Sequence, residues 1–346
     1  MIEKQSDTRP KSPPSSRSAN ATGWILLILG GVAVPFVLSG FQLFQISQIL
    51  VYAIALLGLN FLSGYSGQIS IGHGAFFALG AYTAAILSEH FGVSFYLAVP
   101  AAALVCLCVG FLFGLPALRL EGLYLALATF ALAVATPQVL KYKAFEDLTG
   151  GVQGIYMEKP NAPFGIPLDS DQWTYFLCFA VCVVMFVLGR NMMRGRVGRA
   201  LVAIRDHSTA AQTMGVNAAL YKSVTFGVSA LYAGVAGALS CVVVQFVAPD
   251  SFGMFVSITF FVGSIVGGVT SISGAIYGAI FIQFLPNIAG HLSKSAPWAI
   301  YGVLLIAVVY FMPNGVAGAV KSLQKGFVDR RAGSTPKAAN QSQDKS

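Results

Sequence analysis

The chain has 346 residues, of which 56% are hydrophobic and only 10% are charged, and its mean hydropathy is +0.72. Soluble domains carry about 25% charged residues, so this composition excludes an ordinary water-soluble fold. Only Glu89 is formally charged within residues 24–118, and only Asp250 and Lys294 within residues 223–320. Because one crossing of a bilayer takes about 20 apolar residues, these tracts predict a bundle of membrane-spanning helices.

In chain order, the sequence begins with a Ser- and Pro-rich arm over residues 1–22, which is typical of disorder. The apolar run that follows has no clean cleavage site and predicts a retained signal-anchor helix. The membrane domain is then expected over residues 23–320, with a disordered tail over 321–346. We place about ten spans near residues 24–42, 45–62, 69–88, 94–117, 120–140, 173–189, 223–247, 254–271, 275–290 and 296–313.

Two further features of the sequence concern the type of these spans and whether they are continuous. No ten-residue segments alternate between polar and apolar residues, so the sequence predicts negligible strand content and no transmembrane barrel. Gly, Ser and Gln crowd the ends of the third, eighth and ninth spans, which leaves broken or re-entrant helices open as an alternative there.

The basic residues are spread unevenly over the connections, and Lys and Arg favour the cytoplasmic side. Most lie in the N-terminal arm, at Arg119, in the 190–222 loop and in the C-terminal tail, whereas the other connections hold only Lys141, Lys143, Lys159 and Lys294. We therefore expect both termini and the 190–222 loop in the cytoplasm, and the 141–172 loop in the periplasm. Anionic lipid or an acidic partner explains the net charge of +8, so nucleic-acid binding is not expected.

Signatures of catalysis and of metal binding are absent from the sequence. It has no phosphate-binding loop, His-Glu-x-x-His motif or Gly-x-Ser-x-Gly elbow. Cys178 and Cys182 share a helical face, but no His or Asp nearby completes a ligand set, so we expect neither a metal site nor an enzyme. Ionisable residues deep in the helices, which a proton-driven carrier needs, are nearly absent. The sequence favours transport without an energy source of its own.

The first of three informative segments covers residues 58–82, where glycines alternate with residues that can hydrogen-bond. Such glycines allow close helix approach or non-helical backbone beside a cavity. The candidates for a translocation path are Asn60, Gly64, Tyr65, Ser66, Gly67, Gln68, Gly72, His73 and Gly74, with Ser70 beside them. The alternative is a set of helix-packing glycines next to a polar cytoplasmic turn.

The second segment, residues 194–217, is the longest basic stretch. Its helix-forming residues predict one short amphipathic helix over 199–214, and Gly215 supplies a stop. One side of that helix holds Leu201, Ile204 and Ala211 or Thr209, and the other holds Arg205, Asp206 and Gln212. Such a helix suits the groove of a partner protein; a helix held on the lipid surface by its arginines is the alternative.

The third segment, residues 263–279, is again rich in small residues. Gly263 and Gly267, and likewise Gly274 and Gly278, stand four residues apart, which is typical of close helix packing. This segment loosely resembles the first one. Small-residue interruptions in both halves of a chain are what an internal repeat around a central pathway would produce.

These residues resemble a known family. Gly64-Tyr-Ser-Gly-Gln-Ile-Ser-Ile-Gly-His-Gly-Ala75 is similar to the signature of the permease subunits of bacterial branched-chain amino acid ABC importers. The stretch from Gly195 to Asp206, followed by 210–215, resembles their cytoplasmic coupling loop, and residues 313–318 resemble their closing motif. The stretch 119–129 fits the M-type subunit better than the H-type. The resemblance covers about residues 45–320.

The sequence also departs from the family. Thr270 replaces a glycine of the third segment, and Ala275 stands where proline is expected. Of the importers' general coupling motif only Thr209-Ala210-Ala211 and Gly215 remain. These changes concern the local conformation and the substrate.

The resemblance implies a multi-pass inner-membrane subunit that pairs with a second permease, two cytoplasmic ATPases and a periplasmic substrate-binding protein. The chain would bind no cofactor, because the partner subunits would hydrolyse ATP. Coupling to them would fall to Arg199, Ala203, Arg205, Asp206, Ala210, Ala211 and Gly215. The implied substrates are leucine, isoleucine and valine or a related small molecule, selected mostly by the binding protein.

Three alternatives stay open. Related importers carry urea, short amides or aromatic acids. An ion-coupled secondary transporter would need a carboxylate at mid-membrane depth, whereas Glu89 and Glu121 lie near span ends. A structural or enzyme-anchoring membrane protein would need no Gly-rich polar interruption beside a basic helix.

Overall fold

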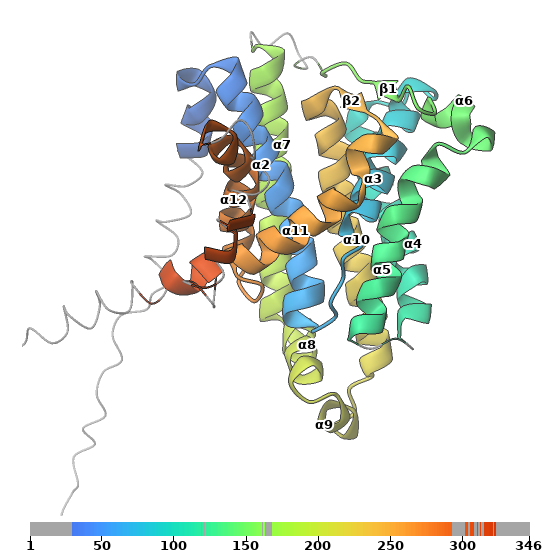
Figure 1. Cartoon of the computed structure of the whole chain (residues 1–346), viewed down its shortest axis with the longest axis vertical. Coiled ribbons are helices and arrows are strands. Elements are labelled where there is room, and N and C mark those ends of the chain that lie inside the picture. Colours follow the sequence, from blue (N-terminus) through green and yellow to red (C-terminus); the bar gives the residue numbers. More distant parts are fainter. Residues whose placement is uncertain are drawn as a thin grey trace, which may run out of the picture.

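A computed structural model describes residues 30–292 except 119, 121, 161 and 163–167, together with scattered positions between 302 and 322. Nearly all of this part of the chain is helical (Figure 1). The only strands within it are the two-residue β1 (Ile155–Tyr156) and β2 (Phe246–Val247), which pair antiparallel. The predicted all-α class is confirmed.

The long elements are α2 (Gly40–Leu59), which continues as the π-helix η1 (Asn60–Tyr65), α3 (His73–Glu89), α4 (Phe95–Ala117), α5 (Leu123–Leu140), α7 (Ser170–Arg194), α10 (Ala218–Val244), α11 (Met254–Gly267) and α12 (Gly274–Leu292). The short ones are η2 (Lys143–Phe145), α6 (Glu146–Thr149), α8 (Arg196–Asp206), α9 (Ser208–Thr213) and η4 (Pro249–Phe252). Six of the described stretches are long and apolar enough to cross a membrane. The chain is a multi-pass membrane protein, while the tenth expected span and both expected tails fall largely outside the described residues.

The structure divides the first expected span, residues 24–42. Residues 30–37 are helical, the chain leaves the helix at Leu38, and α2 begins a new helix at Gly40. The Ser39 N–H donates to Gln42 Oε1 at 3.1 Å, which is half of a capping box and favours a helix start at this point. One uninterrupted span to residue 42 is therefore wrong, and residues 24–29 lie outside the described part.

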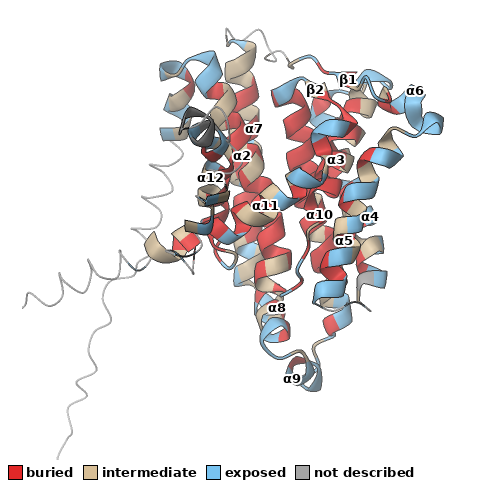
Figure 2. Ribbon diagram, viewed as in Figure 1, coloured by how far each residue is buried: buried red, intermediate tan, exposed pale blue. Residues whose placement is uncertain are grey.

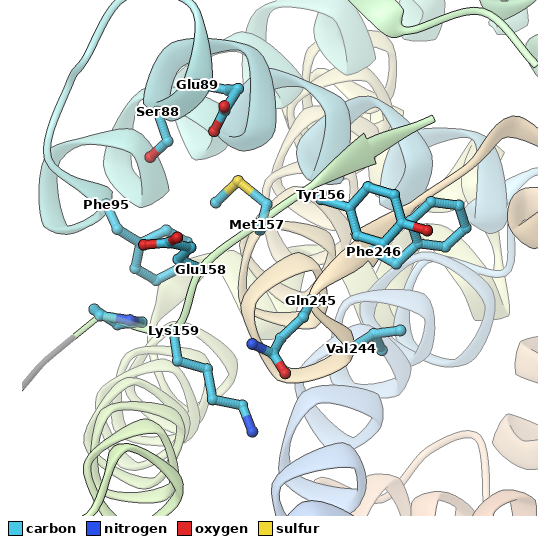
Figure 3. Close-up of a pocket in the computed structure, with 11 residues that line it drawn as sticks. Ser88, Glu89, Phe95, Tyr156, Met157, Glu158, Lys159, Val244, Gln245 and Phe246 are labelled. Atoms are coloured by element: carbon cyan, nitrogen blue, oxygen red, sulfur yellow. The ribbon is translucent and has the colours of Figure 1, made fainter. Parts of the chain in front are cut away.

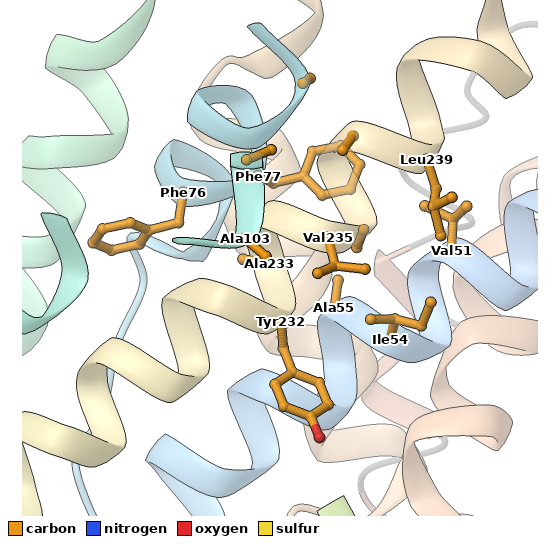
Figure 4. Packing of buried hydrophobic residues seen from close by; sticks show 14 of the residues in the cluster. Val51, Ile54, Ala55, Phe76, Phe77, Ala103, Tyr232, Ala233, Val235 and Leu239 are labelled. Carbon is orange, nitrogen blue, oxygen red and sulfur yellow. The ribbon is translucent and has the colours of Figure 1, made fainter. Parts of the chain in front are cut away.

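Helix α10 forms the centre of the bundle and packs along α2, α3 and α4. In its most apolar stretch 83% of the residues are buried, against 28% in α5 and in α7, which form the outside. Figure 2 shows this gradient from the buried centre to the exposed rim. Figure 4 shows Tyr232, Val235 and Leu239 of α10 beside Ile54 of α2 and Phe77 of α3.

Small residues on α10 allow this close packing. A Cβ at Gly237 would overlap the Phe77 carbonyl of α3, and one at Gly234 would come within 2.5 Å of Cys106 Sγ on α4. Without hydrophobic driving force inside lipid, such close backbone approach is the main source of helix association. Cys106 serves here as a small, buried packing residue.

The helical chain is interrupted at two places, each close to the boundary between two expected spans. The chain leaves helical geometry at residues 66–72, between η1 and α3, and again at 268–273, between α11 and α12. Figure 1 shows the first link climbing from the end of the bundle that carries α8 and α9 toward the start of α3. The third and eighth expected spans are therefore shorter than predicted, because α3 starts at His73 instead of residue 69 and α11 ends at Gly267 instead of residue 271.

The opposite end of the bundle carries η2, α6, β1 and β2 (Figure 1). Two ion pairs tie this end to neighbouring helices: Lys141 Nζ lies 2.5 Å from Asp250 Oδ1, and Lys159 pairs with Asp171 at the start of α7. Asp169 caps α7 by accepting from the Ser170 N–H at 3.0 Å, so the helix begins three residues before the predicted position.

Candidate functional site

The link 66–72 is neither helix nor strand and runs inside the helical bundle. Gly67 has φ +72°, a backbone conformation that glycine adopts without strain. The even-numbered residues of the link are buried, namely Ser66, Gln68, Ser70 and Gly72, while Gly67 and Ile69 are exposed. The polar side chains of the predicted path therefore point into the protein, and its outer side is formed by Gly67, Ile69 and the backbone.

Hydrogen bonds from both sides hold this link in place. The Ile71 N–H donates to Thr129 Oγ1 of α5 at 3.0 Å. Gln68 Nε2 donates to Ser66 Oγ at 2.7 Å and to the Lys222 carbonyl of α10 at 3.3 Å. Gly72 leaves no room for a Cβ beside the Thr129 carbonyl.

The start of α3 is fixed by contacts to two other helices. His73 is buried, and its Nε2 lies 2.8 Å from the Ala55 carbonyl of α2. The Gly74 N–H donates to Ser257 Oγ of α11 at 3.0 Å. Helix starts leave backbone N–H groups without intrahelical partners, and Ser257 satisfies one of them inside the membrane. His73 and Gly74 thus hold three helices together at this point.

The first and third Gly-rich segments meet at Asn60, whose side chain is fully buried at the start of η1. Its Oδ1 accepts from Ser264 Oγ at 2.6 Å, and its Nδ2 donates to the Ser271 carbonyl at 3.1 Å. A Cβ at Gly64 would overlap the Val269 carbonyl. The π-helix η1, which leads into the first interruption, is therefore in direct contact with the second interruption, although the contacting residues Asn60 and Ser271 are 211 positions apart in sequence. Tyr65 is half-buried, with its ring centroid 6.3 Å from that of Phe61.

The glycines of the third segment lie where α11 and α12 touch. A Cβ at Gly267 would overlap the Gly274 carbonyl, one at Gly278 would overlap the Gly263 carbonyl, and one at Gly263 would overlap the Ile282 side chain. From the closing motif, Gly315 has φ +70° and packs on the backbone of Gly268. Pro313 and Asn314 of that motif lie outside the described residues.

The basic segment folds as two helices, α8 and α9, and not as the single helix predicted over 199–214. His207, with φ −150° and ψ 89°, separates them. In a straight helix Ile204 and Ala211 would lie about 10 Å apart along the axis. The break brings both into one buried cluster with Ala218, so tertiary packing outweighs the helix propensity of the segment.

The predicted division of this segment into two sides is correct. Leu201, Ile204 and Ala211 are buried, whereas Arg199, Ala203, Arg205, Asp206, Ala210, Gln212 and Gly215 are exposed. Gly215 has φ +83° and ends α9, as predicted. Met214 at the tip of α9 is 85% exposed and is the most exposed large apolar side chain of the described residues.

Two cavities lie at opposite ends of the bundle. A cavity of about 220 Å³ near α8 is lined by Ser66, Gly67, Gln68, Ile204, Arg205 and Lys222, among others. A larger one of about 980 Å³ lies at the β1–β2 end, where Glu89, Glu158, Lys159 and Gln245 surround it (Figure 3). No cluster of three or more His, Cys, Asp or Glu within the described residues has the arrangement of a metal site.

Sequence reasoning missed the partners of the predicted residues. Thr129, Ser257, Ser264 and Ser271 all bond to the first Gly-rich segment, and all four are buried. A single Ser or Thr in an apolar span gives no sign of its partner, because the partner lies in a distant part of the sequence. Met214 offered one local signal: a large apolar residue directly before a helix-ending glycine in a polar loop.

The fold and this junction define a polytopic helical membrane protein of the transporter type, in which interrupted helices meet inside the bundle. A family model described as the permease component of branched-chain amino acid transport systems matches residues 42–312. The chain belongs to this family. Its matched region contains both interruptions and the helices α8 and α9.

Individual relatives agree with the family. The chain is 30% identical to the high-affinity branched-chain amino acid transport system permease protein LivM of Salmonella typhimurium, and 28% identical to LivM of Escherichia coli. Each alignment covers 84% of this chain and 73% of the relative. A probable branched-chain amino acid transport permease protein, LivH of Methanocaldococcus jannaschii, is 27% identical over 76% of this chain and 87% of its own length. No solved structure matches the chain.

Proposed function

We propose that this chain is the M-type permease subunit of an ABC importer that carries leucine, isoleucine and valine across the bacterial inner membrane. The observation that carries the proposal is the family match over residues 42–312, because it includes every element of the junction described above. A second permease would complete the path, a periplasmic binding protein would deliver the substrate, and two ATPase subunits would hydrolyse ATP. This chain would bind no cofactor.

The proposed topology has ten spans and both termini in the cytoplasm. Its support is the distribution of charge: α8 carries Arg196, Arg199 and Arg205, and basic residues favour the cytoplasmic side. The helices α8 and α9 stand at one end of the bundle and β1 and β2 at the other (Figure 1). The 141–172 loop would then face the periplasm, and the 190–222 loop would face the ATPases.

The proposed ATPase contact is the exposed side of α8 and α9, with Met214 at its tip. An exposed apolar side chain on an otherwise polar projection suits a groove in a partner protein. The residues that are likewise exposed on α8, on α9 or directly after α9 are Arg199, Ala203, Asp206, Ala210 and Gly215. Ala211 supports that side from within, because it is buried against Ile204.

The proposed translocation path runs along the outer side of the 66–72 link. Non-helical backbone at membrane depth cannot face lipid, because its polar groups need partners. Gly67 and Ile69 expose this backbone, while Asn60, Gly64, Ser66, Gln68 and His73 hold it from behind. Water in the path, or the second permease, would supply the missing partners.

Reconstituted transport tests this function. The chain, its candidate partner permease and two candidate ATPases are placed in liposomes with the binding protein, and uptake of labelled leucine is measured with and without ATP. ATP-dependent uptake that isoleucine and valine compete away is the expected result. If urea, short amides or aromatic acids compete and isoleucine and valine do not, the proposed substrate is wrong and the competing compound takes its place. Uptake driven by an ion gradient without ATPases would contradict the importer.

A further inference from the structure

Arg205, in the last turn of α8, has a side chain that is 32% exposed, and its guanidinium reaches from α8 to the end of η1. Its Nη1 donates to the Gly64 carbonyl at 3.0 Å. Its Nε and Nη2 lie 3.0 Å and 2.9 Å from Asp206 Oδ1, so the neighbouring carboxylate holds the other edge of the same planar group. A rigid fork of five donors can make both contacts at once, which an ammonium cannot.

The acceptor of this bond lies at the end of a helix. Gly64 belongs to the last turn of η1, where carbonyl groups lack intrahelical partners and carry partial negative charge. A cation at this position satisfies a carbonyl and favours the helix end. Gly67, with φ +72°, completes the fit, because a Cβ there would lie only 2.9 Å from Arg205 Cγ. The sequence thus leaves space for the arginine stem.

Beyond Gly64 the contacts continue to the second interruption. Gly64 packs on the Val269 carbonyl, and one turn earlier Asn60 bonds to Ser264 and Ser271. A displacement of α8 would therefore move the end of η1 through the Arg205 side chain, and η1 contacts both interruptions.

We infer that Arg205 is a positioning residue that joins α8 to the two interrupted helices, and that it is not a contact for the ATPases. This inference rests on the proposed function. In it, α9 and the exposed side of α8 receive the movement of the ATPases, and Arg205 passes that movement to η1 and the 66–72 link. Without the Arg205 side chain, the ATPases would still hydrolyse ATP, but hydrolysis would be uncoupled from substrate transport.

The test uses the complete reconstituted importer with Arg205→Ala. The control is Arg194→Ala, which removes the same charge from an exposed position in the last turn of α7, outside the proposed ATPase contact. Three quantities are measured: co-purification of the ATPases, ATP hydrolysis, and substrate moved per ATP hydrolysed. Arg205→Ala should leave ATPase co-purification and ATP hydrolysis unchanged. It should lower the amount of substrate moved per ATP by about tenfold or more, since losing a charge-assisted hydrogen bond shifts a two-state equilibrium by that factor.

A merely structural role would lower transport and hydrolysis together, leaving their ratio unchanged, and this result would overturn the inference. Loss of ATPase association in Arg205→Ala would also overturn it, because the side chain would then be part of the docking surface. If Arg205→Ala does not assemble, Arg205→Lys keeps the charge but cannot hold Gly64 and Asp206 together. An intermediate ratio is expected for it, and a wild-type ratio would contradict the inference.

The control also separates this inference from the proposed function. If the wild-type chain and Arg194→Ala show no ATP-dependent uptake, the proposed function fails, and the result says nothing about Arg205. If both transport normally and Arg205→Ala does as well, the proposed function stands and only the role of Arg205 fails.

Discussion

At the scale of single residues, Asn60 is the side chain on which the junction most depends. Its amide uses its oxygen for Ser264 and its nitrogen for Ser271, and it is completely buried. Removing it would leave a hydroxyl and a carbonyl without partners in an apolar interior. Leaving buried polar groups unpaired costs more than the bond itself contributes in water.

Asn60→Ala should therefore lower the free energy of unfolding by about 1–3 kcal/mol, the usual cost of an unsatisfied buried group. Thermal unfolding of the purified protein in detergent measures the change. Gln138→Ala removes the same kind of amide from an exposed position on α5 and should leave the melting temperature nearly unchanged. Equal shifts in both variants would mean that the Asn60 contacts contribute nothing specific.

At the scale of elements, the 66–72 link depends on α5 through one hydroxyl. Thr129 Oγ1 accepts from the Ile71 N–H at 3.0 Å and also lies 3.0 Å from the Ala126 carbonyl of its own helix. Thr129→Val keeps the shape of the side chain but removes the acceptor. The Ile71 N–H would then be unpaired within the membrane.

Thr129→Val should speed hydrogen exchange of the backbone amides in residues 66–72 by about tenfold, the equivalent of one lost hydrogen bond. It should also slow uptake. Thr136→Val is the matched control, since that hydroxyl bonds only to the Leu132 carbonyl within α5. Exchange that accelerates equally in both variants would show that α5 as a whole, and not the bond to Ile71, holds the link.

The elements also show what the sequence could predict. Hydropathy located α4, α5, α7 and α10 to within about five residues, because their apolar length is a local property. It could not place the helix ends at Ser39, His73 or His207. Those ends are set by a capping side chain, by contacts to α2 and α11, and by the packing of Ala211 on Ile204. The contacts that set the start of α3 come from Ala55 and Ser257, which are distant in the sequence, so no local pattern contains them. Ile204 and Ala211 are only seven residues apart, but a break between them at His207 leaves no mark in their apolar spacing.

The candidate site, too, could be predicted from the sequence only in part. The three Gly-rich or basic segments could be identified from composition, since glycine beside polar residues is unusual in a span. Their mutual contact could not, because Asn60 and Ser271 are 211 residues apart. The side on which each residue of 66–72 lies also required the structure. Burial places Ser66, Gln68 and Ser70 inside the protein and leaves Gly67 and Ile69 exposed.

At the scale of the whole molecule, the proposed ATPase contact predicts the effect of a charge at Met214. Met214→Glu would carry a carboxylate into the partner's groove, and burying an unpaired charge is costly. The dissociation constant for the ATPases should rise by at least about tenfold. Val152→Glu places the same charge at the other end of the bundle, where Val152 is 68% exposed, and should have no effect. Unchanged binding in Met214→Glu would remove α9 from the interface.

The same two positions test the proposed orientation. Val152→Cys should react with a membrane-impermeant maleimide in intact spheroplasts, whereas Met214→Cys should react only after the membrane is opened. The five native cysteines lie within the helices α4, α7 and α10, so the unmodified chain gives the background labelling. This pattern is expected because the arginines of α8 hold its end of the bundle on the cytoplasmic side. Labelling of Met214→Cys in intact spheroplasts would invert the topology and place α8 and α9 out of reach of cytoplasmic ATPases.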